Sequence, residues 1–223
     1  MAFQYTATEL ENALLILSLS TALTYGCIVH SQPSQLRMVT KTLSIGILSV
    51  LSAVTHGPKL LGAAQAFGAL GDGFLAWTSD EAFLRGLASF LAAHVFYIIL
   101  FAQKGHGLEL FWSEPWRIPA ACSMALLTCV LVGVLLPRVP RDLQIPISVY
   151  SSAILSMVFA ALTMTDHFIV LGALLFTMSD GILATGRFLV PATSRHQTWM
   201  EYGVWSLYYS GQLLIHLGMK RHS

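Results

Sequence analysis

Apolar stretches of membrane-spanning length follow one another along almost the whole of this 223-residue chain. A helix needs about 20 mostly apolar residues to cross the hydrocarbon core of a bilayer. Eight such windows, separated by short polar or proline-containing breaks, cover roughly residues 10–30, 36–54, 60–77, 84–103, 117–136, 144–163, 167–188 and 200–219. Because no break is long enough for a soluble domain, we predict an all-α fold, a polytopic membrane bundle of about eight transmembrane helices in which residues 1–223 form a single transmembrane domain.

The charge content supports a membrane protein and excludes several other classes. Only 10% of the residues are charged, against about 25% in ordinary soluble domains. The formal net charge of +1 and the absence of a glycine-rich phosphate loop argue against a nucleic-acid partner. Three cysteines and eight histidines lack the spacing of a disulfide framework or a metal site, so we expect no metal and no cofactor. We expect an integral, multi-pass protein, in the endoplasmic reticulum membrane if eukaryotic and in the inner membrane if bacterial.

Two aspartates interrupt these apolar windows, and each begins a similar phrase. Asp72 lies in the phrase GDGFLA of residues 71–76, and Asp180 in SDGILA of residues 179–184. A carboxylate in hydrocarbon is costly unless it is protonated, paired or hydrated, so an intramembrane aspartate indicates a function. The third and seventh windows run in the same direction, which is compatible with a duplicated four-helix unit.

The two carboxylates are predicted to lie at one depth. Each precedes the end of its window by about five to seven residues, which at 1.5 Å per residue places it roughly 8–10 Å below the same membrane surface. Polar residues of other windows are expected nearby and form the candidate substrate-binding set. This set is Lys41, His94, Tyr97, Arg187, Tyr208, Tyr209 and Gln212. Five tryptophans lie mostly near window ends, as interfacial residues do.

Each of these residues also has a purely structural interpretation. The aspartates would form hydrogen bonds between helices or an ion pair with Lys41. Lys41 would, in its own structural interpretation, extend its ammonium group to the membrane surface. His94 and Tyr97 would be interhelical contacts, and Arg187 an interfacial anchor. Three further functions compete with an enzymatic one: a proton-coupled transporter of small molecules or lipids, an intramembrane aspartyl protease, and a non-catalytic lipid-binding or assembly protein.

Several short motifs, in order, resemble one family over most of the chain. They are Gly71-Asp72 with Trp77, His94-Val95-Phe96-Tyr97, the phrase GALLFTMSDGILA of residues 172–184, and Tyr208-Tyr209 followed by Gln212-Leu213-Leu214-Ile215. Through these motifs the chain resembles the YhhN-like lysoplasmalogenase family of multi-spanning membrane hydrolases. The resemblance implies hydrolysis of the vinyl ether bond of lysoplasmalogens, which are lysophospholipids, to a fatty aldehyde and a glycerophospho-alcohol. It also implies that Asp72 and Asp180 are the catalytic pair.

The chemistry of the reaction suits two carboxyl groups. A vinyl ether is hydrolysed by protonation of its β-carbon, followed by capture of the oxocarbenium ion by water. An acid and a base are therefore needed, and two carboxyl groups in a low-dielectric site can hold different protonation states. We expect one aspartate to donate the proton while the other stabilises the cation and orients water. Lys41 would keep one of them ionised, and the sequence leaves open which.

Overall fold

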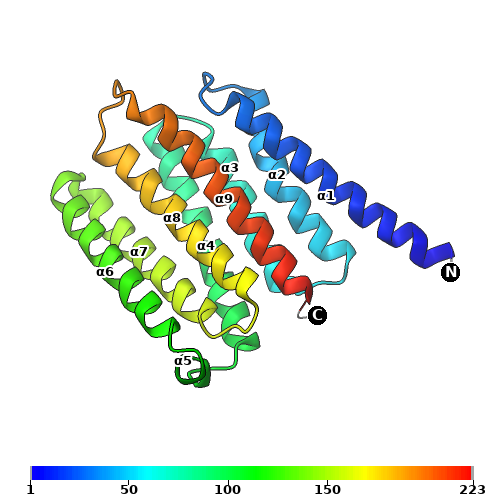
Figure 1. Cartoon of the computed structure of the whole chain (residues 1–223). Coiled ribbons are helices and arrows are strands. Elements are labelled where there is room, and N and C mark those ends of the chain that lie inside the picture. Colours follow the sequence, from blue (N-terminus) through cyan, green and yellow to red (C-terminus); the bar gives the residue numbers. More distant parts are fainter. Residues whose placement is uncertain (1, 222–223) are drawn as a thin grey trace. The chain divides into compact units, whose positions relative to one another are not determined.

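The computed structural model describes residues 2–221, with side chains from residue 8 onward, and throughout that range the chain is helical without β-strands (Figure 1). The elements are α1 (Ala2–Ile28), α2 (Gln35–Val54), α3 (Lys59–Leu75), α4 (Asp80–Lys104), α5 (Glu109–Ser113), α6 (Arg117–Leu135), the 3-10 turn η1 (Leu136–Arg138), α7 (Arg141–Ala161), α8 (His167–Phe188) and α9 (His196–Arg221). Each of the eight apolar windows is occupied by a long helix. The all-α prediction is confirmed.

Among the described residues, six helices are both long enough and apolar enough to cross a membrane: α1, α2, α4, α6 with η1, α7 and α8. Large apolar side chains on these helices are exposed, for example Leu23 at 71% and Leu126 at 67%, as expected for surfaces that face lipid tails. The protein is therefore an integral multi-pass membrane protein. The count of eight spans stays a prediction, because α3 and α9 are not among the six, and the duplicated four-helix unit stays a prediction as well.

The chain divides into two compact units. The first contains the described residues up to Phe96 together with residues 219–221, and the second is Tyr97–Gly218. In the first unit, α2 packs between α1 and α3. Serine hydroxyls join these helices, since Ser18 Oγ donates to the Ser44 carbonyl at 2.6 Å and Ser49 Oγ donates to the Gly62 carbonyl at 2.7 Å. Lipid tails are as apolar as the helix surfaces, so the hydrophobic effect does not drive helices together inside a membrane. Side-chain hydrogen bonds such as these stabilise the helix contacts instead.

In the second unit, α7 packs between α6 and α8, and α9 lies against α8. The α8–α9 contact depends on two glycines: a Cβ on Gly172 would lie 2.7 Å from the Gly211 carbonyl oxygen, and a Cβ on Gly211 would lie 2.7 Å from that of Gly172. Only residues without a side chain permit backbones to approach this closely. The contact is supported further along by Ser179 Oγ, which donates to the Val204 carbonyl at 2.9 Å.

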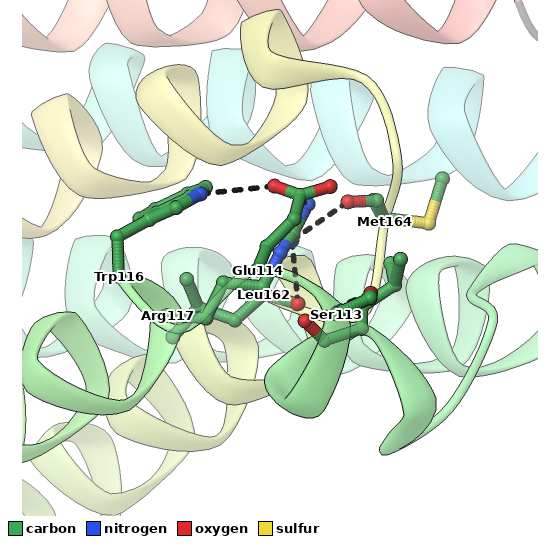
Figure 2. A network of polar contacts seen from close by, with 7 residues as sticks. Ser113, Glu114, Trp116, Arg117, Leu162 and Met164 are labelled. Carbon is green, nitrogen blue, oxygen red and sulfur yellow. Dashed lines mark hydrogen bonds and ion pairs between the residues drawn. The ribbon is translucent and has the colours of Figure 1, made fainter.

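A buried arginine joins the start of α6 to the segment that follows α7 (Figure 2). Arg117 is fully buried, and its Nη1 donates to the carbonyls of Leu162 and Met164 at 2.7 and 2.9 Å. Its Nη2 lies 3.0 Å from Glu114 Oε2, which also accepts a 2.9 Å hydrogen bond from the Trp116 indole. The Trp116 hydrogen bond, and then the Arg117 charge, lower the pKa of the Glu114 carboxyl. The network thus satisfies carbonyls that a helix end leaves without intrahelical partners.

Candidate active-site residues

Asp72 forms an ion pair with Lys41 inside the first unit. Lys41 Nζ of α2 lies 3.3 Å from Asp72 Oδ1 of α3, and the two side chains are only 11% and 1% exposed. Lys41 also lies over the Tyr25 ring of α1, 5.7 Å from the ring centroid. An ion pair this deeply buried holds both partners in their charged forms, because neutralising either one would leave the other charge unpaired in a low-dielectric environment.

The glycine that precedes Asp72 explains how α3 comes close to α4. A Cβ on Gly71 would lie 2.6 Å from the Phe90 ring, so the missing side chain is what allows that ring to pack on the α3 backbone. One turn further along α4, His94 is fully buried and its Nδ1 lies 2.6 Å from the Phe90 carbonyl oxygen. Because a carbonyl only accepts, Nδ1 carries the proton. On the same helix Phe96 stacks on Phe67 of α3, with ring centroids 5.5 Å apart.

Asp180 has a different partner in the second unit. The Tyr150 hydroxyl of α7 donates to Asp180 Oδ2 of α8 at 2.9 Å. Both side chains are partly exposed rather than buried. The two aspartates therefore occupy different environments, the first paired with an ammonium group and the second bonded by a phenol.

Tyr97 and Gln212 form a second polar pair within that unit. The Tyr97 hydroxyl of α4 donates to Gln212 Oε1 of α9 at 2.5 Å, and both residues are fully buried. Among the residues that the structure describes, the buried Gln212 Nε2 has no hydrogen-bond partner. Phe176 of α8 contacts the rings of both Tyr97 and Tyr208 edge-on, with centroids 6.4 and 5.2 Å apart. An amide donor is thus held in an aromatic environment and is available to an oxygen atom of a bound molecule or water.

The candidate set is consequently divided between the units. Lys41, Asp72 and His94 belong to the first, and Tyr97, Asp180, Arg187, Tyr208, Tyr209 and Gln212 belong to the second. The expected ion pair between Lys41 and an aspartate is present, and it involves Asp72. Arg187 is exposed in the last turn of α8, a position equally suited to a phosphate contact and to an interfacial anchor.

The assumption behind the equal depth of the two carboxylates is wrong. Asp72 lies three residues before Leu75, where α3 ends, whereas Asp180 lies eight residues before Phe188, where α8 ends. The sequence-based estimate of five to seven residues is too long for α3, because that helix ends at Leu75 although apolar residues continue to Trp77. It is too short for α8, whose last residue, Phe188, is also the last residue of the apolar window. The apolar window therefore overestimated the length of α3.

Three polar residues that form interhelical or buried contacts were not predicted from the sequence: Tyr25, which contacts Lys41, Tyr150, which contacts Asp180, and Arg117 of the buried network at the start of α6. Tyr150 lies alone in an apolar window, 30 residues from its partner, and no local spacing relates it to Asp180. Arg117 begins a predicted window, where a basic residue is expected at the membrane surface, yet it is buried. The one available signal was that Tyr150 lies inside an apolar window, where its hydroxyl needs a hydrogen-bond partner on a neighbouring helix.

Known proteins similar to this chain place it in a family. The model of the YhhN family matches residues 36–219, a range that includes every candidate site residue. The lysoplasmalogenase TMEM86B of Sus scrofa is 34% identical over 199 residues, which cover 87% of this chain and 80% of the relative. The protein of the same name from Homo sapiens is 30% identical over 180 residues, 79% of this chain and 70% of the relative. The lysoplasmalogenase TMEM86A of Bos taurus is 28% identical over 161 residues, 68% and 61% of the two chains. No solved structure matches. The chain belongs to the YhhN family.

Proposed function

We propose that this protein is a membrane-embedded hydrolase that cleaves the vinyl ether bond of lysoplasmalogens, lysoplasmenylcholine or lysoplasmenylethanolamine. The products are a fatty aldehyde and the corresponding glycerophospho-alcohol. Membership of the YhhN family and the names of the relatives support the substrate class. The structural observation that carries the proposal is that Asp72 and Asp180, both in apolar helices, are each held by a polar side chain of a neighbouring helix.

This reaction needs acid–base chemistry and stabilisation of a positive charge. Protonation of the β-carbon converts the vinyl ether to an oxocarbenium ion, which a water molecule captures to form a hemiacetal. The hemiacetal then collapses to aldehyde and alcohol. A positioned carboxylic acid contributes typically about 10²–10⁴-fold to such a proton transfer, and a carboxylate fixed beside the developing cation lowers its energy most effectively where water is excluded. The two aspartates would divide these roles.

The other candidate residues suit the remaining parts of a lysophospholipid. The fully buried Gln212 amide, fixed by Tyr97, would donate to the glycerol oxygen or to the attacking water. His94, Tyr208 and Tyr209 are buried polar groups that would orient the same atoms. Exposed Arg187 would bind the phosphate, for which a guanidinium group has matching geometry. The apolar chain would remain among the helices and the lipid tails.

The direct test uses purified protein in detergent with a lysoplasmenylethanolamine and with its saturated ether analogue. We expect free aldehyde from the vinyl ether and none from the analogue. Asp72→Asn and Asp180→Asn should lose turnover, whereas Asp142→Asn, which changes an exposed aspartate at the start of α7, should retain it. If the wild-type protein releases no aldehyde, the proposal fails. Uptake driven by a pH gradient in proteoliposomes, without aldehyde release, would favour the transporter interpretation.

A further inference from the structure

Arg37 lies in the first turn of α2, one helical turn from the buried Lys41–Asp72 ion pair. We infer that Arg37 binds the phosphate of the lysophospholipid and thereby holds the glycerol of that lipid beside Asp72. All three residues belong to the first unit. The inference rests on the proposed function for the identity of the lipid, whereas the anion site itself is formed by this helix pair alone.

The position of Arg37 follows from two matching helical turns. Its Nη1 donates to the carbonyl of Ala76, the C-cap residue of α3, at 3.2 Å. Arg37 precedes Lys41 by four residues on α2, and Ala76 follows Asp72 by four residues on α3. Residues four apart lie on one face of a helix, about 6 Å apart along its axis. Arg37 therefore lies one turn nearer the helix ends than the ion pair does, close enough for its charge to act on Lys41.

The Arg37 guanidinium group keeps hydrogen-bonding capacity that the protein does not use. Its Nε is buried and has no hydrogen-bond partner among the residues that the structure describes. Within the same part of the chain, Arg37 forms no ion pair with a carboxylate. The edge made by Nε and Nη2 can bind two oxygens of one phosphate side by side. The side chain as a whole is only partly buried, so an anion can reach this edge and supply the missing acceptor.

The start of α2 strengthens the attraction for an anion. The N-terminus of a helix carries a partial positive charge and N–H groups without intrahelical partners. The first turn of α2 contains no acidic residue that would offset this charge, and the Ser34 side chain accepts only from the Arg37 N–H. The first turn of α7 differs, because Asp142 follows Arg141 there. The start of α2 and the Arg37 side chain thus present positive charge together, as in anion sites at helix N-termini.

A lysoplasmalogen fits this arrangement in length and in charge. Its phosphate ester oxygen and its vinyl ether oxygen are separated by the three glycerol carbons, which span a distance similar to one helical turn of about 5.4 Å. A phosphate on Arg37 therefore places the ether oxygen at the level of Asp72. The phosphodiester carries one negative charge, which balances Arg37 and leaves the Lys41–Asp72 pair intact, so no buried charge loses its partner.

Binding of two ligands that are not cleaved tests the site. One is a saturated ether lysophosphoethanolamine, and the other is the same ether of glycerol without the phosphate. Tritium-labelled ligand is added to the purified full-length protein in detergent micelles, and scintillation proximity measures each Kd. We expect the wild type to bind the phosphate-bearing ligand about 10–100-fold more tightly, the range for hydrogen bonds to charged groups. Arg37→Gln should bring this ratio close to one and leave the affinity for the glycerol ether unchanged.

Two further arginine variants control for structure. Arg141→Gln, which changes an exposed arginine in the first turn of α7, should keep the wild-type ratio. Arg37→Lys keeps a positive charge and a donor for the Ala76 carbonyl but lacks the planar edge, so it should lose about threefold to tenfold of the ratio; this variant decides the question if Arg37→Gln does not fold. An unchanged ratio in both Arg37 variants would overturn the inference. Equal weakening of both ligands would overturn it too, because that result indicates a structural role for the bond to Ala76.

Two comparisons identify which anion binds and which arginine binds it. Glycerophosphoethanolamine, a soluble phosphodiester without the chain, should displace the labelled lipid only at much higher concentration. If it binds as tightly as the lipid does, and Arg37→Gln abolishes that binding, the ligand is a soluble phosphodiester and the lipid assignment is overturned. Loss of the ratio in Arg187→Gln, with the ratio kept in Arg37→Gln, would assign the phosphate to Arg187 instead.

This binding assay fails independently of the proposed function, because neither ligand is cleaved. A wild-type protein that releases no aldehyde from a vinyl ether, yet binds the lipid with an Arg37-dependent ratio, would overturn the hydrolase and leave the phosphate site standing. Aldehyde release by a wild type whose ratio does not depend on Arg37 would leave the function standing and overturn the phosphate site alone.

Discussion

Replacement of Lys41 by methionine should destabilise the protein because it removes the ammonium group that pairs with the buried Asp72 carboxylate. Methionine keeps an apolar stem against Tyr25, so the main loss is the ammonium group 3.3 Å from Asp72 Oδ1. With the Asp72 side chain 1% exposed, removal of one partner of the pair is expected to cost about 3–5 kcal/mol of unfolding free energy. This is a large share of the roughly 5–15 kcal/mol that stabilises a typical fold.

The double variant Lys41→Met with Asp72→Asn distinguishes a charge effect from a packing effect. Because no buried charge remains, its unfolding free energy should return to within about 1 kcal/mol of the wild type. The measurement is equilibrium unfolding in mixed micelles followed by circular dichroism for the wild type, both single variants and the double variant. A Lys41→Met cost below about 0.5 kcal/mol, or a double variant no more stable than Lys41→Met, would refute the reasoning.

Three further predictions concern activity, pH and packing. If Asp72 and Asp180 serve one reaction, each Asn variant should lower kcat by about 10²–10⁴-fold and the double variant should lose little more; independent, multiplicative losses measured by aldehyde release would argue against one site. Because folding lowers the pKa of Glu114, its contribution to stability is present above the unfolded glutamate pKa and is lost as pH falls through the folded pKa. Glu114→Gln should therefore reduce the stability lost on acidification, as thermal unfolding across pH would show. Gly172→Val should cost about 1–3 kcal/mol through overpacking against the α9 backbone, whereas Gly133→Ala, with open space around it, should be tolerated in the same unfolding assay.

The helices could be predicted from the sequence because apolar windows mark the helices themselves, and the polar or proline-containing breaks between them mark the connecting turns. All eight windows contain a long helix, and the breaks contain the expected turns, such as the segment before α3 that includes Pro58. Polar residue types inside apolar windows also indicated Lys41 and Asp72, and the two form an ion pair. A buried charge is costly enough that its presence in such a window is itself informative.

Which side of each helix faces protein could not be predicted in the same way. Lipid tails and a protein core are both apolar, so hydropathy alone does not separate them. Trp205 illustrates this: the five tryptophans lie mostly near window ends, as interfacial residues do, yet this one is buried beside Tyr208 and Tyr209. The Tyr150 hydrogen bond to Asp180 depends on the mutual rotation of α7 and α8, which no local pattern encodes.

The fate of the solvent proton tests the proposed chemistry most directly. The vinyl ether reaction in D₂O should give an aldehyde with one deuterium on the carbon next to the carbonyl, because that carbon receives the acid's exchangeable proton. In H₂¹⁸O the glycerol hydroxyl released should keep its original oxygen, because water attacks the other side of the cleaved bond. Preformed aldehyde incubated under the same conditions controls for later exchange, and mass spectrometry reads both products. An aldehyde without that deuterium, or a glycerol hydroxyl labelled with ¹⁸O, would contradict hydrolysis through β-carbon protonation.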